Sequence, residues 1–187
     1  MEADDDAALM ATFVATRDRR VYTVLFDRHH RSILRHVQRY VREPGQAEEL
    51  TQDVFVRVYR TKQYEPKTKF KTWLFRVATN VCLNELRRPE RREKFDVIEE
   101  GREPKGDGPS PEGNVAGKEL ALRLEQALAK LPANQRAAFL LARQDQLSHE
   151  EIAQTLDTTV SAVKSLIHRA LEALRRDLSE VQMEAGS

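Results

Sequence analysis

The chain has little of what builds a cross-linked, exported or membrane protein. Its 187 residues include one cysteine, Cys82, which excludes an internal disulfide framework and any cysteine-rich zinc site. No apolar run approaches the ~20 residues that a membrane-spanning helix needs. The acidic N-terminus, residues 1–6, lacks the basic and then apolar segments of a signal peptide. We therefore expect a soluble, intracellular protein. Cys82 stands among Val77, Val81 and Leu86, and we interpret it as a buried thiol.

Patterns typical of enzymes and metal proteins are missing as well. The sequence has no glycine-rich phosphate loop, no metal-ligand spacing and no nucleophile placed beside a base. His29, His30 and His36 fall on one basic helix, and with no cysteine or carboxylate partner in register we interpret them as polar surface residues. The sequence therefore predicts a protein without catalytic residues, cofactor or metal.

Charge is balanced over the whole chain but unevenly distributed along it. The formal net charge is only +1, which excludes a uniformly basic coat for nucleic acid. Residues 67–94 hold nine Lys and Arg against three Asp and Glu, whereas residues 95–116 hold two against six. Such segregation indicates a local basic surface followed by an acidic segment.

Apolar residues recur at helical spacing, and we find no strand pattern and no internal repeat. The expected helices cover about residues 7–16, 20–41, 46–62, 69–87, 118–130 and 134–145, followed by a helical pair. Pro44-Gly45 is interpreted as ending the second helix and Pro89 as ending the fourth.

Residues 95–117 are rich in Gly, Pro and acidic residues, and they carry too little apolar surface to offset the entropy of ordering. We interpret them as a flexible acidic linker. The sequence thus predicts an all-α protein with two small helical domains, residues 1–94 and 118–187, joined by this linker.

Residues 147–170 have the layout of a helix-turn-helix, in which two short helices meet at a tight turn and the second is basic. Ser148 is a good N-cap, and Glu151 completes a capping box. Asp157 tolerates the left-handed conformation that the turn requires. The alternative is an ordinary amphipathic helical hairpin. The residues expected on the outer face, available to phosphates and base edges, are Ser161, Lys164, Ser165, His168 and Arg169.

Three segments together resemble hallmarks of bacterial sigma factors of the extracytoplasmic-function group, group IV of the sigma-70 superfamily. Residues 47–59 resemble the A-E-[DE]-L-x-Q-[DE]-x-F pattern, and residues 70–80 resemble F-x-x-W-L-x-x-[IV]-A-x-N. Residues 131–165 resemble the third hallmark, from Leu131-Pro132 to Val163-Lys164-Ser165. Their order and separations also agree with that family.

The resemblance implies a transcription initiation factor of the bacterial cytoplasm that binds core RNA polymerase and helps to melt promoters. The first domain would be region 2, with one helix docking on the clamp helices of the β′ subunit. The docking residues implied are Glu48, Glu49, Gln52, Asp53 and Phe55. Without the resemblance, an acidic solvated face is the alternative.

The basic stretch after residue 63 is interleaved with aromatic residues, as in surfaces that hold unpaired strands. The resemblance places a base pocket at residues 64–68 and implies these contacts to the −10 element: Tyr64, Lys67, Lys69, Lys71, Trp73, Arg76, Asn80, Asn84, Arg87 and Arg88. We interpret Phe70 and Leu74 as core residues. For Trp73, core packing and strand contact both stay open.

In the second domain, region 4, the basic helix would read the −35 element. Arg169 is the best candidate for bidentate contact with guanine, and Arg175 and Arg176 would contact phosphates. Leu166 and Leu171 stand where many members carry Arg, which leaves room for an unusual −35 sequence.

The implied partners are the β and β′ subunits of core polymerase, promoter DNA and an anti-sigma factor, without insertion into a membrane. The acidic linker would thread the polymerase channel, or act only as a solvated tether. A stand-alone helix-turn-helix regulator with a helical sensing or dimerisation domain is the alternative function, although it leaves the basic aromatic stretch unexplained.

Overall fold

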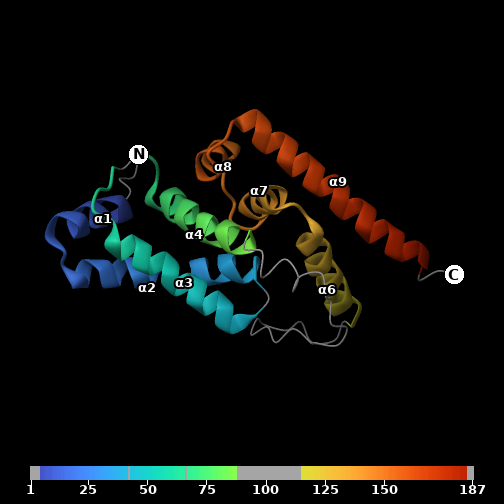
Figure 1. Ribbon diagram of the computed structural model, residues 1–187, viewed down its shortest axis with the longest axis horizontal. Helices are drawn as coiled ribbons and strands as arrows, with labels where there is room; N and C mark the ends of the chain where they lie inside the picture. The colour runs from blue at the N-terminus through green and yellow to red at the C-terminus, as the bar shows by residue number, and fades with distance from the viewer. Residues whose placement is uncertain (1–4, 42, 66, 88–114, 185–187) are drawn as a thin grey trace.

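The computed structural model describes residues 5–41, 43–65, 67–87 and 115–184, with side chains from 119 to 179 in the last range. Every regular element in these ranges is an α-helix, which confirms the all-α prediction (Figure 1). The helices are α1 Asp5–Thr16, α2 Arg19–Gln38, α3 Pro44–Arg60, α4 Phe70–Leu86, α6 Val115–Lys130, α7 Ala133–Arg143, α8 His149–Leu156 and α9 Val160–Glu184.

Helices α1 to α4 pack together as a first helical group. Helix α2 lies against α1 and α3, and α4 packs on α3. Phe70 and Leu74 point into this group and are at most 1% exposed, as the sequence predicts. Cys82 is fully buried there, and burial raises the pKa of its thiol above the ordinary range. Cys82 is therefore a packing residue, as expected.

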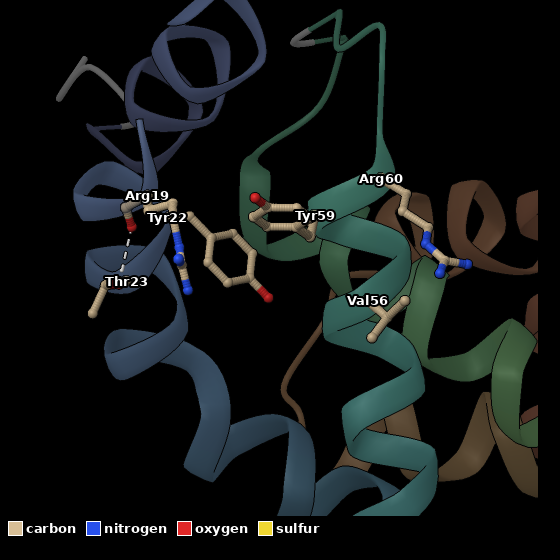
Figure 2. A pocket seen from close by; sticks show the side chains of 6 residues that line it. All are labelled: Arg19, Tyr22, Thr23, Val56, Tyr59 and Arg60. Atoms are coloured by element: carbon tan, nitrogen blue, oxygen red, sulfur yellow. Dashed lines mark hydrogen bonds between the residues drawn. The ribbon is translucent and has the colours of Figure 1, made fainter. Parts of the chain in front are cut away.

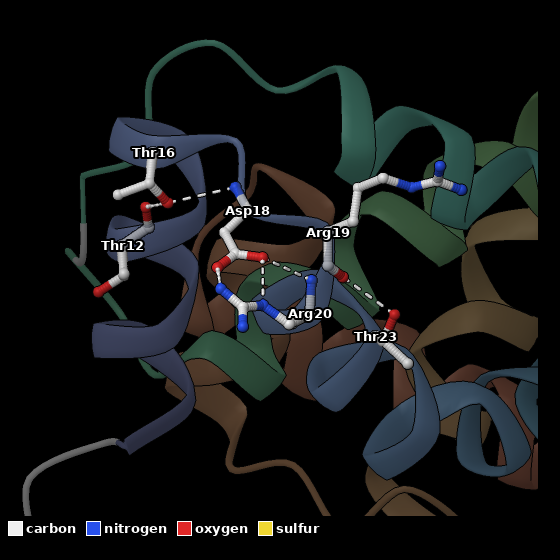
Figure 3. Close-up of polar contacts among 6 residues, drawn as sticks. All are labelled: Thr12, Thr16, Asp18, Arg19, Arg20 and Thr23. Carbon is white, nitrogen blue, oxygen red and sulfur yellow. Dashed lines mark hydrogen bonds and ion pairs between the residues drawn. The ribbon is translucent and has the colours of Figure 1, made fainter.

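The corner between α1 and α2 is set by local hydrogen bonds. The carboxylate of Asp18 accepts from the backbone N–H of Arg20 at 2.9 Å and from its guanidinium, as an N-cap does (Figure 3). The hydroxyl of Thr16 accepts from the backbone N–H of Asp18. These contacts start α2 at Arg19 and turn it back along α1.

The chain between α2 and α3 differs from the prediction. Helix α2 ends at Gln38 rather than near Val41, and Pro44 begins α3 instead of ending α2. Proline suits the first position of a helix because its fixed φ is helical and no N–H is needed there. The predicted stop signal is thus a start signal for α3, two residues before the expected Gln46.

Helices α6 to α9 form a second helical group around buried Leu140, Ile152 and Val163. Helix α6 begins at Val115, so residues 115–117 belong to a helix and not to the predicted linker. The Ala-, Leu-, Glu- and Lys-rich sequence that follows offsets the ~1 kcal/mol that Gly117 costs within a helix. The rest of the predicted linker, residues 95–114, and the proposed helix end at Pro89 lie outside the described residues.

The two groups are in contact, since α4 of the first packs against α7 and α8 of the second (Figure 1). The predicted tethered arrangement did not include this contact. Among the described residues, no helix combines the length and the apolar character needed to cross a membrane.

Candidate nucleic-acid interface

The helix-turn-helix is built by its predicted capping residues. The hydroxyl of Ser148 accepts from the backbone N–H of Glu151 at 3.2 Å, and the Glu151 carboxylate accepts from the backbone N–H of Ser148 at 2.9 Å. At the other end of α8, Asp157 adopts the left-handed conformation, with φ 52° and ψ 55°. The backbone N–H groups of Asp157 and Thr158 then bond to the carbonyl of Ala153. Both predicted signals are confirmed, and they fix the angle at which α9 leaves the turn.

The first half of α9 presents one open polar face. Val163 and Ile167 are buried against the second helical group. Leu166 and Leu171 are half-buried against the same core, so they contribute packing where a cation would contribute charge. The face that remains exposed carries all five predicted −35 contacts: Ser161, Lys164, Ser165, His168 and Arg169.

Helix α4 and the residue before it carry a stripe of cations and amides, which we call the α4 stripe. Its members are spaced by three or four residues, so they share one helix face. All are exposed except Trp73, which is half-buried. The α4 stripe consists of Lys69, Trp73, Arg76, Asn80, Asn84 and Arg87.

Trp73 both packs and faces outward. Its ring lies 5.2 Å from that of Tyr64 in a T-shaped pair and 5.7 Å from that of Phe70. Tyr64 is also half-buried, so the loop before α4 is anchored to the helix by aromatic contacts. The two open interpretations of Trp73 are therefore compatible, because part of the ring is buried and part stays accessible.

Other predicted −10 residues lie elsewhere. Lys67 is exposed in the loop and pairs with Glu65 at 2.8 Å, and this hydrogen bond raises the pKa of Lys67. Lys71 lies on another side of α4, with its ammonium 5.6 Å from the centre of the Phe75 ring. Arg88 lies outside the described residues.

Four of the five predicted polymerase-docking residues share one exposed face of α3: Glu48, Glu49, Gln52 and Asp53. The fifth, Phe55, lies inside the first helical group and is only 4% exposed. Its ring packs against Phe26 at 4.8 Å and His30 at 5.9 Å. Phe55 therefore packs behind the predicted docking face and is not part of its surface.

The α3 face continues further than the sequence analysis recognised. Val56 and Tyr59 are 42% and 41% exposed, a large fraction for apolar side chains. With Tyr22 of α2 they line a shallow hollow bordered by Arg19 and Arg60 (Figure 2). The signal that would have found them is helical spacing, since Val56 lies four residues after Gln52.

The predicted surface location of the histidines is wrong for His36, which is fully buried. Its Nδ1 lies 2.7 Å from a carboxylate oxygen of Asp145, and its Nε2 lies 3.1 Å from the hydroxyl of Thr79. His29 is half-buried beside Asp6 at 2.8 Å. The interpretation failed because the partner of His36 is 109 residues away in sequence. Within the described ranges, no three His, Cys, Asp or Glu side chains gather as metal ligands would.

Comparison with protein families assigns both helical groups. Residues 25–93 match the family described as sigma-70 region 2, and residues 121–174 match the family described as sigma-70, region 4. The two matches follow the order of the predicted surfaces, with α3 and the α4 stripe in the first and α8 and α9 in the second.

Curated relatives match along most of their length. The chain is 34% identical to the ECF RNA polymerase sigma factor SigE of Mycolicibacterium smegmatis, over all of this chain and 74% of that protein. It is 34% identical to the ECF sigma factor SigW of Bacillus subtilis, over 73% of this chain and 77% of that protein. The ECF sigma-E factor of Escherichia coli K12 is 32% identical over 84% of this chain and 86% of that protein.

Solved structures share the fold. CnrH, in complex with the cytosolic domain of CnrY, superposes with a TM-score of 0.68 at 22% identity, covering 94% of this chain and 97% of that one. The sigma factor RpoE of Bartonella quintana, in complex with the anti-sigma factor NepR, superposes with a TM-score of 0.65 at 22% identity, covering 84% of this chain and 96% of that one.

Proposed function

The chain belongs to the extracytoplasmic-function sigma factors of the sigma-70 family. We propose that three of its surfaces bind core polymerase, the −10 strand and the −35 element, one surface for each partner. Proteins of this family are non-catalytic initiation factors that bind RNA polymerase and direct it to promoters, and this is the function of the chain. The observation that supports this assignment is the α4 stripe, because a stand-alone DNA-binding regulator does not need a second surface for an unpaired strand.

The first surface, on α3, docks on core polymerase. Its N-terminal part is acidic and exposed at Glu49, Gln52 and Asp53, while Val56 and Tyr59 add apolar area that would be buried on docking. Acidic side chains suit a basic partner helix, and the apolar end supplies the desolvated contacts on which affinity depends. We assign its target to the clamp of the β′ subunit.

The second surface, the α4 stripe, holds the unpaired −10 strand. From Lys69 to Arg87 it extends about 27 Å at about 1.5 Å per residue, which matches roughly eight stacked nucleotides. Lys69, Arg76 and Arg87 are placed to follow phosphates, and Asn80 and Asn84 offer amides to base edges. The exposed part of Trp73 provides a stacking surface.

The third surface, the open face of α9, reads the −35 element as the second helix of a helix-turn-helix does in the major groove. Arg169 is exposed near the middle of this face, where it can contact guanine O6 and N7. Arg175 and Arg176 are exposed further along α9 and would contact phosphates.

We further infer an anti-sigma partner, since CnrH and RpoE were each solved in complex with another protein. The proposed partners are then the β and β′ subunits, promoter DNA and an anti-sigma factor, in the bacterial cytoplasm. The proposed division of the chain keeps residues 1–94 as the region 2 domain and begins the region 4 domain with α6.

Run-off transcription with core polymerase free of any sigma factor tests the function. The chain alone should confer promoter-specific transcripts on this core. A stand-alone regulator would do so only when a housekeeping sigma factor is already present. Promoter-specific transcripts that require such a factor would overturn the proposal.

A further inference from the structure

The corner between α1 and α2 contains an arginine in a backbone conformation that favours glycine. Arg17 directly follows α1 and has φ 56°, in the left-handed region, and its backbone N–H bonds to the carbonyl of Phe13 at 2.8 Å. Glycine is the usual residue at such a helix end, because a Cβ atom is disfavoured there. An arginine costs stability by comparison, and residues held in such conformations cluster at functional sites. The side chain of Arg17 therefore calls for an explanation.

This side chain reaches the end of another helix. Its guanidinium donates to the backbone carbonyl of Tyr59 at 3.0 Å and to that of Thr61 at 2.8 Å, which lie 42 and 44 residues further along the chain. The same guanidinium lies 5.4 Å from the centre of the fully buried Phe13 ring. A cation is favourable at the C-terminal end of a helix, where carbonyls outnumber the helix's own donors. Arg17 thus caps α3 from the α1–α2 corner.

The loop between α3 and α4 begins at this cap. Its described residues are 61–65 and 67–69. Further along, Tyr64 packs its ring 5.2 Å from that of Trp73 on α4. The loop is therefore held at two places, by Arg17 where it leaves α3 and by Tyr64 where it passes α4. Without the first contact, the second would have to position the loop alone.

The same loop borders the surface that is proposed to hold the −10 strand. Lys69 of the α4 stripe ends the loop, and Tyr64 lies against Trp73, whose exposed part was assigned above to base stacking. A base stacked on Trp73 would also meet the edge of the loop. Stacking accepts every base, so selection among bases requires polar groups at fixed positions. The loop can supply such groups when its own position is fixed.

We propose that Arg17 is a positioning residue for base selection, which bonds the carbonyls of Tyr59 and Thr61 and so fixes where the loop leaves α3 and which base it accepts beside Trp73. The inference rests on the proposed function of the α4 stripe. Arg17 acts through the loop and needs no contact with the strand. Loss of its side chain should blunt the base preference and leave strand binding in place, since the cations of the stripe remain.

Arg17→Gly separates this role from that of a corner residue. Glycine adopts the left-handed conformation readily, and both bonds of the guanidinium lie at the surface, so the variant should unfold close to wild type. Arg17→Lys keeps the charge but lacks the planar fork that bonds two carbonyls at once. The control is Arg20→Met, because Arg20 is an exposed arginine of the same corner whose ion pair is with Asp18.

Tryptophan fluorescence of the full chain tests the positioning. Trp73 is the only tryptophan in the sequence, so its emission reports on the loop residue that covers it, Tyr64. In Arg17→Gly and Arg17→Lys, acrylamide quenching of Trp73 should increase and its emission should shift to longer wavelength. Arg20→Met should match wild type. Unchanged quenching in both Arg17 variants, at the helix content of wild type, would overturn the positioning role.

The consequence for DNA is tested by selection from a pool of single strands with a randomised central segment, bound by holoenzyme reconstituted from core polymerase and the full chain. Wild type should prefer one base at least ~10-fold at one position, a typical cost of a wrong base, and Arg17→Gly should reduce this preference to about twofold. Total strand binding should stay within about threefold, because phosphate contacts supply most of it. Arg17→Lys should lie between the two.

Two outcomes of the selection would overturn the inference alone. They are a wild-type base preference in Arg17→Gly, and an equal loss of preference in Arg20→Met, which would indicate a general effect of charge. Both leave the proposed function of the α4 stripe intact. A wild-type holoenzyme that preferred no base at any position would instead overturn that function, and the inference with it.

Discussion

On the α3 face that we propose docks on core polymerase, Asp53 lies between acidic Glu49 and apolar Val56 on the exposed side of the helix. Asp53→Arg should weaken association with core polymerase at least ~10-fold, since close charge pairs across interfaces couple by about 1.5–7 kcal/mol. The measurement is a titration of labelled chain with core enzyme. Asp27→Arg, at an exposed acid on α2, is the control and should bind as wild type does. Equal binding by both variants would remove Asp53 from the docking surface.

For single residues, the sequence predicted exposure correctly where helical spacing determines which side chains face outward. It failed where a side chain is buried by partners that are distant in sequence. The five residues on the open face of α9 follow from the helical period alone. Phe55 entered the docking set through a motif, but its ring is held inside by Phe26 and His30 of α2. His36 is buried because Asp145 and Thr79 satisfy both ring nitrogens, and neither residue is near it in sequence.

Among the elements, those with strong local signals were predicted most closely. Helix α8 begins after Ser148 and ends at Leu156, just before Asp157, where the capping box and the left-handed turn were expected. The end of α2 and the start of α3 were predicted wrongly, because a proline such as Pro44 can either end one helix or be the first residue of the next. Helix α6 begins before the expected residue 118, because the sequence analysis grouped residues 115–117 by composition with the acidic segment before them.

The capping box of α8 predicts a pH dependence of stability. Burial acts to raise the pKa of Glu151, but hydrogen bonds from the Ser148 backbone and the Thr72 hydroxyl outweigh it, and the pKa is lowered. A carboxyl with a lowered folded-state pKa stabilises the fold above its unfolded pKa, and this contribution is lost as pH falls through the folded value. Glu151→Gln should therefore be less stable than wild type near neutral pH, and the difference should vanish in acid.

Denaturant unfolding followed by circular dichroism, from pH 7 down to about pH 3, measures that difference. Glu150→Gln is the matched control, because Glu150 is exposed in the same first turn of α8. The control should stay close to wild type throughout. If the difference in unfolding free energy between Glu151→Gln and wild type did not change with pH, the lowered pKa of Glu151 would be contradicted.

For the whole molecule, the fold class and the order of the two sigma-70 regions could be predicted, but the packing of one helical group on the other could not. Helical periodicity reports which face of a helix is apolar and not which other helix covers it. The contact depends on Asp145 meeting His36 and Arg39, which are more than 100 residues away, and on Thr72 meeting Glu151. Flexible attachment was expected because the acidic segment between the groups carries no apolar pattern.

The two surfaces proposed to bind DNA lie on different helical groups, so a change on one should leave the other intact. The residues proposed to face the −35 element are exposed on α9, whereas the α4 stripe belongs to the first group. Arg169→Ala should weaken binding to a −35 duplex by about 1–3 kcal/mol, because it removes the proposed bidentate base contact, and it should leave binding of a −10 single strand unchanged. Titrations of both DNAs at one fixed salt concentration make the comparison, since phosphate contacts depend steeply on salt. If Arg169→Ala weakened strand binding as much as duplex binding, Arg169 would contribute general positive charge to both DNAs, and the open face of α9 would not be the surface that reads the −35 sequence.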